Sequence, residues 1–178
     1  MNSWREAERF GDLPAEAARR FGEREGLVFK DRRYTFPELA EQVDLAARAL
    51  IALGVTAGDH VALWLNNCDD WIFFQYATAK IGAVLVPINT RFRTADLEYV
   101  LRQSDSTMLI THNVSGPIDY LGMVREVVAL PDSGDTIDDP NFPLLRKVVI
   151  VDAASHTGTA HWGEAKRAEA CGWCARHA

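Results

Sequence analysis

Short apolar runs alternate with helix-like segments along most of this chain, and this alternation constrains the fold more than any other feature. The runs lie at residues 60–65, 83–87, 107–111 and 147–151, and the segments between them carry helical spacing. Strand–helix–strand units of this kind place their strands in parallel. We therefore predict an α/β fold with a mainly parallel sheet flanked by helices.

A small β-hairpin is predicted ahead of that sheet, from residues 26–35, after a short helix at 13–21. The helix that follows has the clearest boundary signals in the chain. Thr35 can cap its start, while Glu38 reaches back to complete a capping box. Gly54 suits the left-handed residue just past its end.

Polar residues that can cap a helix also precede two later segments with helical spacing. Asp69 or Asp70 can cap the first of these, and Thr94 can cap the second. A third segment has weaker spacing and no clear cap. The chain therefore predicts three further helices, at 71–81, 95–103 and about 118–130.

Two stretches fall outside this alternation. Residues 132–143 hold four Asp, two Pro and one Gly, which favours a surface loop or a flexible excursion. The sequence from residue 153 is rich in Ala, His and Gly, with a helical hint only at 162–170, so we expect poor order there. This predicts one unit over residues 1–151 and an ill-matched tail over 152–178.

Charge and cysteine content narrow the class of protein. The formal net charge of −6 argues against a nucleic-acid partner, because phosphates attract the opposite sign. No apolar run reaches the roughly 20 residues of a transmembrane helix. The first residues lack the apolar stretch of a secretory signal, and three cysteines make no disulfide framework. These features predict a cytoplasmic protein.

Two isolated groups of residues could carry chemistry. Cys171 and Cys174 have the spacing of a redox pair, or of a zinc site completed by His177 and His161. The motif nevertheless lacks the preceding strand and following helix of redox proteins, so a tail without a role is the simpler interpretation.

Other polar residues offer weaker candidates. His60 and His112 stand at strand ends and could act as general bases, or could be solvated residues. Ser115 has no evident base beside it, and no phosphate-binding glycine loop occurs. Trp71, Phe73, Phe74 and Tyr76 cluster on one helix, where a core or interface role is favoured over a ligand pocket.

The segment from Asn89 to Thr94 is the more promising candidate. It follows a strand and opens a helix, and ligands collect at the carboxyl edge of parallel sheets. A helix N-terminus favours anions, and Arg91 and Arg93 would add positive charge for a phosphate. The alternative is that both arginines are solvated and pair with nearby acids.

Five segments in register resemble the adenylate-forming (AMP-binding) superfamily, in particular the fatty-acyl-CoA synthetases. Residues 34–39 resemble its first core motif, and residues 79–89 resemble its second, with Lys80, Gly82 and Pro87 in place. Residues 53–63, 66–71 and 94–111 also fit, so the resemblance runs from about residue 2 to residue 151. It implies the N-terminal subdomain of the acyl-CoA synthetase fold.

The family's reaction joins a fatty or other carboxylic acid to coenzyme A through an acyl-adenylate, with ATP and Mg²⁺. The resemblance places the phosphate loop, the adenylate-binding motifs and the catalytic lysine beyond residue 178; no Ser-Gly-Thr-Thr-Gly sequence occurs. Preorganised phosphate donors and a metal do most of the work in such transfers. We therefore expect an incomplete synthetase that is inactive alone and binds none of these cofactors stably.

The resemblance transfers no catalytic residue and no metal ligand. In some relatives the loop after the second motif approaches the nucleotide end of coenzyme A, which implies a cofactor-binding role for Asn89, Thr90 and Arg91. A different class of function is also open: an interaction module that docks with a separately encoded remainder of the enzyme or with a full-length relative.

Overall fold

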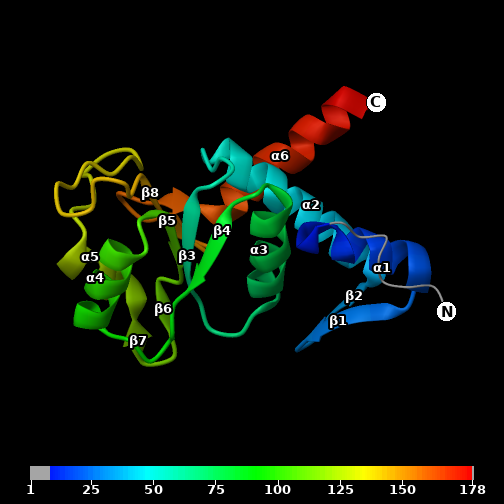
Figure 1. The fold of residues 1–178 in the computed structure, drawn as a ribbon, viewed down its shortest axis with the longest axis horizontal. Helices are drawn as coiled ribbons and strands as arrows, with labels where there is room; N and C mark the ends of the chain where they lie inside the picture. Colours follow the sequence, from blue (N-terminus) through cyan, green and yellow to red (C-terminus); the bar gives the residue numbers. More distant parts are fainter. Residues whose placement is uncertain (1–8, 178) are drawn as a thin grey trace.

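A five-stranded parallel sheet forms the centre of the structure, as the alternation predicted (Figure 1). The computed structural model describes residues 9–177, with side chains described as far as residue 171. The strand order across the sheet is β4-β3-β5-β8-β9. Their bounds are β3 (His60–Trp64), β4 (Val84–Pro87), β5 (Ser106–Thr111), β8 (Lys147–Ile150) and β9 (Ala160–His161).

Helices cover both faces of this sheet, because its central strands are apolar on both sides. Val61 and Leu63 point into one core, whereas Ala62 and Trp64 point into the other. The first core is closed by α2 (Phe36–Ala52), α3 (Asp69–Lys80) and α6 (Trp162–His177), and the second by α4 (Thr94–Gln103) and α5 (Tyr120–Val127).

The N-terminal elements pack beside α2 and α3. They are a 3-10 turn (Phe10–Asp12), α1 (Leu13–Phe21), and the predicted hairpin of β1 (Glu25–Phe29) and β2 (Arg32–Thr35). The capping box of α2 is confirmed. The backbone N–H of Glu38 donates to the Thr35 hydroxyl at 3.3 Å, and the Thr35 N–H donates to the Glu38 carboxylate at 2.8 Å.

The other two predicted caps are wrong by one residue or more. Cys68 is the N-cap of α3, and the buried Asp69 carboxylate is engaged by partners from β2. Arg93 is the N-cap of α4, and the hydroxyl of Thr94 donates to Glu126 on α5 at 3.0 Å. In both places a tertiary partner takes the side chain that the local pattern assigned to the helix start.

The helix predicted at about 118–130 is shorter than expected. A tight hairpin of β6 (Val114–Ser115) and β7 (Ile118–Asp119) precedes it, and α5 then ends at Val127. Asp119 caps this helix, accepting the N–H of Gly122 at 2.7 Å.

Residues 132–143 contain no helix or strand, yet part of this loop belongs to the second core. Ile137 and Phe142 are buried there. The buried Asp139 carboxylate accepts the backbone N–H of Ala129 at 2.8 Å. The predicted surface loop is confirmed, because most of its residues are exposed, and two apolar side chains anchor it to the core.

The region after residue 151 departs from the expected poorly ordered tail. Residues 160–161 extend the sheet as β9, and α6 packs on α2. Trp162 is 2% exposed and its ring centroid lies 4.4 Å from that of Phe74. Residues beyond the expected boundary at residue 151 thus contribute to the central sheet and to its first core. Over the residues that the structure describes, no helix is both long and apolar enough to span a membrane.

Candidate functional site at the carboxyl edge of the sheet

The carboxyl ends of the parallel strands meet at one edge, which is where open α/β sheets bind their ligands. The helix after β3 (α3) covers one face, whereas the helix after β5 (α5) covers the other. The chain therefore diverges between β3 and β5. Trp64 pairs with Thr111 in the sheet, so the segments that follow β3 and β5 leave the sheet side by side, and Asn66 contacts Ser115 there.

That loop is the predicted segment Asn89–Arg91, and two buried aromatic side chains hold its backbone. The indole Nε1 of Trp64 donates to the Asn89 carbonyl at 3.1 Å, and the Tyr120 hydroxyl donates to the Thr90 carbonyl at 3.3 Å. The two rings pack edge to face with centroids 4.6 Å apart. The backbone is thus fixed from inside, and the side chains of Asn89 and Arg91 stay exposed.

The two arginines of this segment have different roles. Arg93 folds back on the loop, and its guanidinium donates to the carbonyls of Phe92 at 2.8 Å and Arg91 at 3.0 Å. The Asn89 side chain accepts the backbone N–H of Arg91 at 2.9 Å. The guanidinium of Arg91 itself makes no hydrogen bond or ion pair with any side chain that the structure describes. Of the predicted phosphate-binding pair, Arg91 is therefore the one available to a ligand.

Asn66 joins this loop to the point of divergence. Its amide donates to the Ser115 hydroxyl at 2.5 Å, and its carbonyl oxygen lies 3.4 Å from the Tyr120 hydroxyl. Because one hydroxyl proton serves both Asn66 and Thr90, Tyr120 links the ends of β3 and β4 through a single buried group. Sequence reasoning missed Trp64 and Tyr120, although a buried Trp or Tyr with a polar end is a recognisable signal.

The predicted histidines lie at opposite ends of the sheet. His112 follows β5 and its Nδ1 lies 3.3 Å from the Asp152 carboxylate, which also accepts the N–H of Asn113 at 2.5 Å. His60 stands at the amino end, where Nδ1 lies 2.5 Å from the Ser104 carbonyl. Ser115 bonds to Asn66 and not to His112, so these groups do not form a nucleophilic triad.

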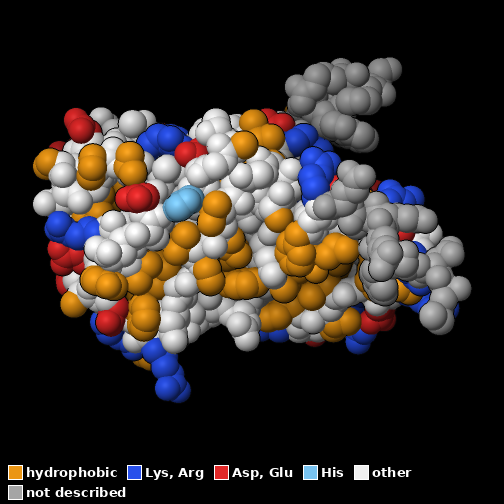
Figure 2. Space-filling model, viewed as in Figure 1, with side chains coloured by type: hydrophobic (Ala, Val, Ile, Leu, Met, Phe, Trp, Pro, Cys, Tyr) orange, Lys and Arg blue, Asp and Glu red, His pale blue; other side chains and the backbone are white. Residues whose placement is uncertain are grey.

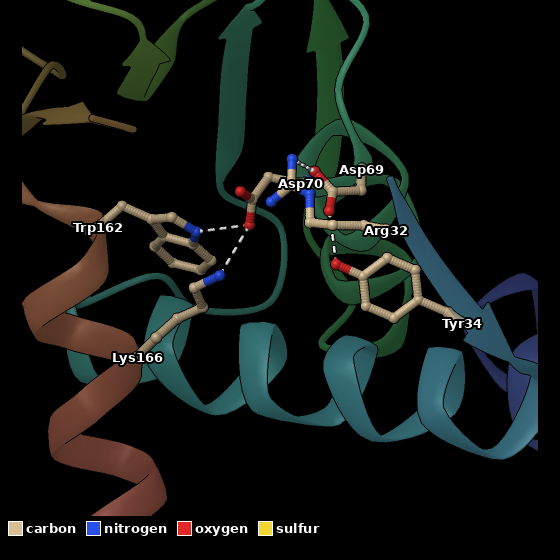
Figure 3. A network of polar contacts seen from close by, with 6 residues as sticks. All are labelled: Arg32, Tyr34, Asp69, Asp70, Trp162 and Lys166. Atoms are coloured by element: carbon tan, nitrogen blue, oxygen red, sulfur yellow. Dashed lines mark hydrogen bonds and ion pairs between the residues drawn. The ribbon is translucent and has the colours of Figure 1, made fainter. Parts of the chain in front are cut away.

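A second polar network lies where α3 begins, and there the charges are used internally (Figure 3). Asp69, 1% exposed as a side chain, accepts the Tyr34 hydroxyl at 2.6 Å and pairs with Arg32 at 2.7 Å. Asp70 accepts the Trp162 indole N–H at 3.0 Å and the Lys166 ammonium at 2.9 Å. The two acids thereby fasten the hairpin and α6 to the same turn of α3.

Burial shifts the pKa of two groups at this network. Desolvation, with the hydrogen bond to Asp69, raises the pKa of Tyr34 to about 12. Desolvation also raises the pKa of Cys68 to about 11. Cys68 lines an apolar depression of about 180 Å³ with Phe29 and Trp71. Its thiol stays protonated near neutral pH, which makes it a weak nucleophile.

The cysteine spacing near the C-terminus lies within α6. Cys171 is exposed, and the side chain of Cys174 falls outside the described part, as does that of His177. His161 caps α6, since its Nδ1 accepts the N–H of Glu164 at 3.0 Å. Within the described residues, no group of three or more His, Cys, Asp or Glu side chains is arranged to hold a metal ion.

The comparisons with known proteins match this geometry. The AMP-binding enzyme family aligns with residues 14–170, so the chain belongs to the AMP-binding enzyme family. The acyl-CoA synthetase homologue YngI of Bacillus subtilis is 31% identical over 160 residues, covering 86% of this chain and 29% of YngI. The human mitochondrial medium-chain acyl-CoA ligase ACSF2 is 32% identical over 147 residues, covering 80% and 24%.

Solved structures agree with these sequence matches. The anthranilate CoA ligase AuaEII superposes with a TM-score of 0.75 over 90% of this chain and 28% of that chain; at 22% identity this likeness shows the fold. The N-terminal domain of FACL13 from Mycobacterium tuberculosis gives a TM-score of 0.70 at 25% identity, covering 90% and 36%. The chain corresponds to the N-terminal part of an acyl-CoA synthetase-like adenylate-forming enzyme, and spans less than a third of its curated relatives.

Proposed function

We propose that this chain forms the N-terminal subdomain of an AMP-forming acyl-CoA synthetase of fatty acid metabolism, and that it is inactive by itself. The complete reaction converts a fatty or other carboxylic acid and ATP, with Mg²⁺, to an acyl-adenylate and pyrophosphate. Coenzyme A then takes the acyl group and AMP leaves. The family match over residues 14–170 carries this proposal. We also propose a cytoplasmic location, because three cysteines fit a reducing compartment.

The loop at residues 89–91 gives this subdomain a ligand-binding role in the proposal. Its backbone is held by Trp64 and Tyr120, so the exposed Arg91 guanidinium is presented from a fixed position. A guanidinium with free donors suits a phosphate. We assign Asn89, Thr90 and Arg91 to the nucleotide end of coenzyme A.

An AMP-release assay tests the inactivity of the isolated chain. The purified chain receives ATP, Mg²⁺, coenzyme A and a panel of short to long fatty acids, and we expect only background turnover. Clear acid-dependent AMP release would contradict this part of the proposal, because it would require an ATP site within these residues.

A chimera tests the synthetase assignment and the loop. In YngI, the segment aligned with this chain is replaced by this chain, and AMP release is measured at varied coenzyme A. We expect acid-dependent activity. Arg91→Ala should raise the KM for coenzyme A roughly tenfold, the loss of one charge-assisted contact. The Arg102→Ala control, at the far end of α4, should leave the KM unchanged.

A second candidate is a non-catalytic module that docks with a separately encoded remainder or with a full-length relative. The open, apolar edge of the sheet at β4 favours it. Two results together would argue against this alternative. The chimera would be active, and the isolated chain would neither bind full-length YngI nor stimulate its activity.

A further inference from the structure

The two edges of the sheet are finished in different ways. At one edge β9 is two residues long, and both of these residues, Ala160 and His161, are buried. At the other edge β4 is longer, and its outer side carries no neighbouring strand within the described residues. Val84 on β4 is 45% exposed. An exposed apolar edge strand is a surface that native proteins normally cover.

The backbone of β4 is poorly suited to receive another strand. The N–H groups of Val84 and Ile88 donate inward, to the carbonyls of Asp59 at 2.8 Å and Leu63 at 2.9 Å. Along a parallel strand, successive residues direct their backbone N–H and C=O groups to opposite sides. The backbone polar groups of Leu85 and Pro87 therefore point away from the sheet. Proline has no N–H, which leaves Leu85 as the one outward donor of β4. Backbone pairing at this edge is therefore limited, and side chains offer a partner the larger contact.

The side chains of β4 offer such a contact. Leu85 packs against the first core, and Ile88 lies in the second. Side chains alternate along a strand, so Val84 and Val86 share the face of Ile88. That face is covered over the central strands but open at the edge, where Val84 is exposed and Val86 half-buried. Figure 2 shows a band of hydrophobic side chains crossing the side of the molecule that carries β4 and α3.

We propose that this β4 surface, formed by Val84 and Val86, docks an apolar element of the remaining part of the acyl-CoA synthetase fold. This inference rests on the proposed function. The solved N-terminal domain of FACL13 holds this fold within 36% of its length, so most of that domain is further polypeptide. A second copy of this chain is less suitable, because two copies with a net charge of −6 repel each other.

Cysteine labelling tests whether the remainder covers this surface. Val84→Cys is made in a Cys171→Ser, Cys174→Ser background, both in the isolated chain and in the YngI chimera. We expect maleimide labelling of Val84→Cys to be at least tenfold slower in the chimera. Ile51→Cys, on α2 and 56% exposed in the wild type, monitors general access to the surface. In addition, Val84→Asp should leave the Tm of the isolated chain unchanged and lower that of the chimera.

Equal labelling of Val84→Cys in the two proteins would overturn the proposal, as would an unchanged Tm of the Val84→Asp chimera. Protection in the isolated chain that grows with its concentration would assign the surface to a second copy instead. AMP release by the chimera separates the two proposals. If Val84→Cys is protected in a chimera that releases no AMP, the docking surface is supported and the synthetase assignment is refuted. If the chimera releases AMP while Val84→Cys is not protected, the synthetase assignment is supported and the docking surface is refuted.

Discussion

The loop at residues 89–91 and the acidic pair Asp69–Asp70 both follow the carboxyl end of a strand, yet they use their polar groups in opposite ways. In the loop, buried Trp64 and Tyr120 hold the backbone, and the side chain of Arg91 stays exposed. In the acidic pair the side chains themselves are bound by internal partners (Figure 3). A polar side chain at this edge of the sheet is thus available to a ligand only where other residues hold the local backbone in place.

Removing the Asp69 side chain should cause the largest loss of stability among the substitutions that test this comparison. Asp69→Ala leaves the Tyr34 hydroxyl without its acceptor and Arg32 without its partner. We expect a loss of about 2–3 kcal/mol in the free energy of unfolding, measured with urea by circular dichroism. Glu98→Ala breaks the exposed pair with Arg102 and should cost less than ~1 kcal/mol. Equal effects of the two substitutions would show that the buried network is not structural.

Tyr120→Phe tests how the loop at residues 89–91 is held, and it should lower the free energy of unfolding less than Asp69→Ala does. The ring and its packing on Trp64 remain, while the hydrogen bonds to Thr90 and Asn66 are lost. We expect destabilisation of about 1 kcal/mol. Amide exchange at residues 89–91 should quicken, while exchange in α3 stays unchanged. Unaltered exchange in the loop would mean that Trp64 alone fixes it.

Alkaline pH should weaken the acidic network selectively. The pKa of Tyr34 is about 12 in the folded protein, above the ordinary value of 10.0. A raised pKa favours the protonated hydroxyl on folding, so this contribution to stability is complete below pH 10 and is lost as the pH rises from 10 to 12. The stability difference between wild type and Tyr34→Phe should shrink across that window, as measured by urea unfolding. A constant difference would contradict the raised pKa of Tyr34 in the folded protein.

Arg91→Ala should have the smallest effect on stability, within about 0.5 kcal/mol, because its guanidinium has no partner among the described side chains. Thermal unfolding of the isolated chain measures it, with Arg32→Ala as the contrasting variant that loses the pair with Asp69. A large loss of stability on Arg91→Ala would place this arginine among the structural residues.

Much of the fold was predictable because its causes are local. The Thr35–Glu38 capping box acts over three residues, and the alternation of apolar runs with helical segments determines the order of strands and helices. The prediction failed where distant partners compete. Asp69 turns to Tyr34 and Arg32, and the Trp162 indole finds Asp70 at a sequence separation of 92 residues. Composition alone therefore missed that α6 packs into the fold.

The candidate site divides in the same way. The sequence placed residues 89–91 after a strand, and so at the carboxyl edge, but it treated Arg91 and Arg93 as equals. The structure separates them, because the carbonyls of Phe92 and Arg91 engage the Arg93 guanidinium. His112 likewise looked unpartnered in the sequence and lies beside Asp152 in the structure.

The sequence by itself determined the four long strands of the sheet, most of the helices between them and the family to which the chain belongs, because periodicity and capping act between near neighbours. Only the tertiary structure decided which charged side chains pair with internal partners and which stay available, and which strand lies at an open edge of the sheet. Those outcomes depend on burial and on partners far away in the chain. A carboxylate at the start of α3 is structural, and a guanidinium after β4 is available, because of what packs beneath each of them.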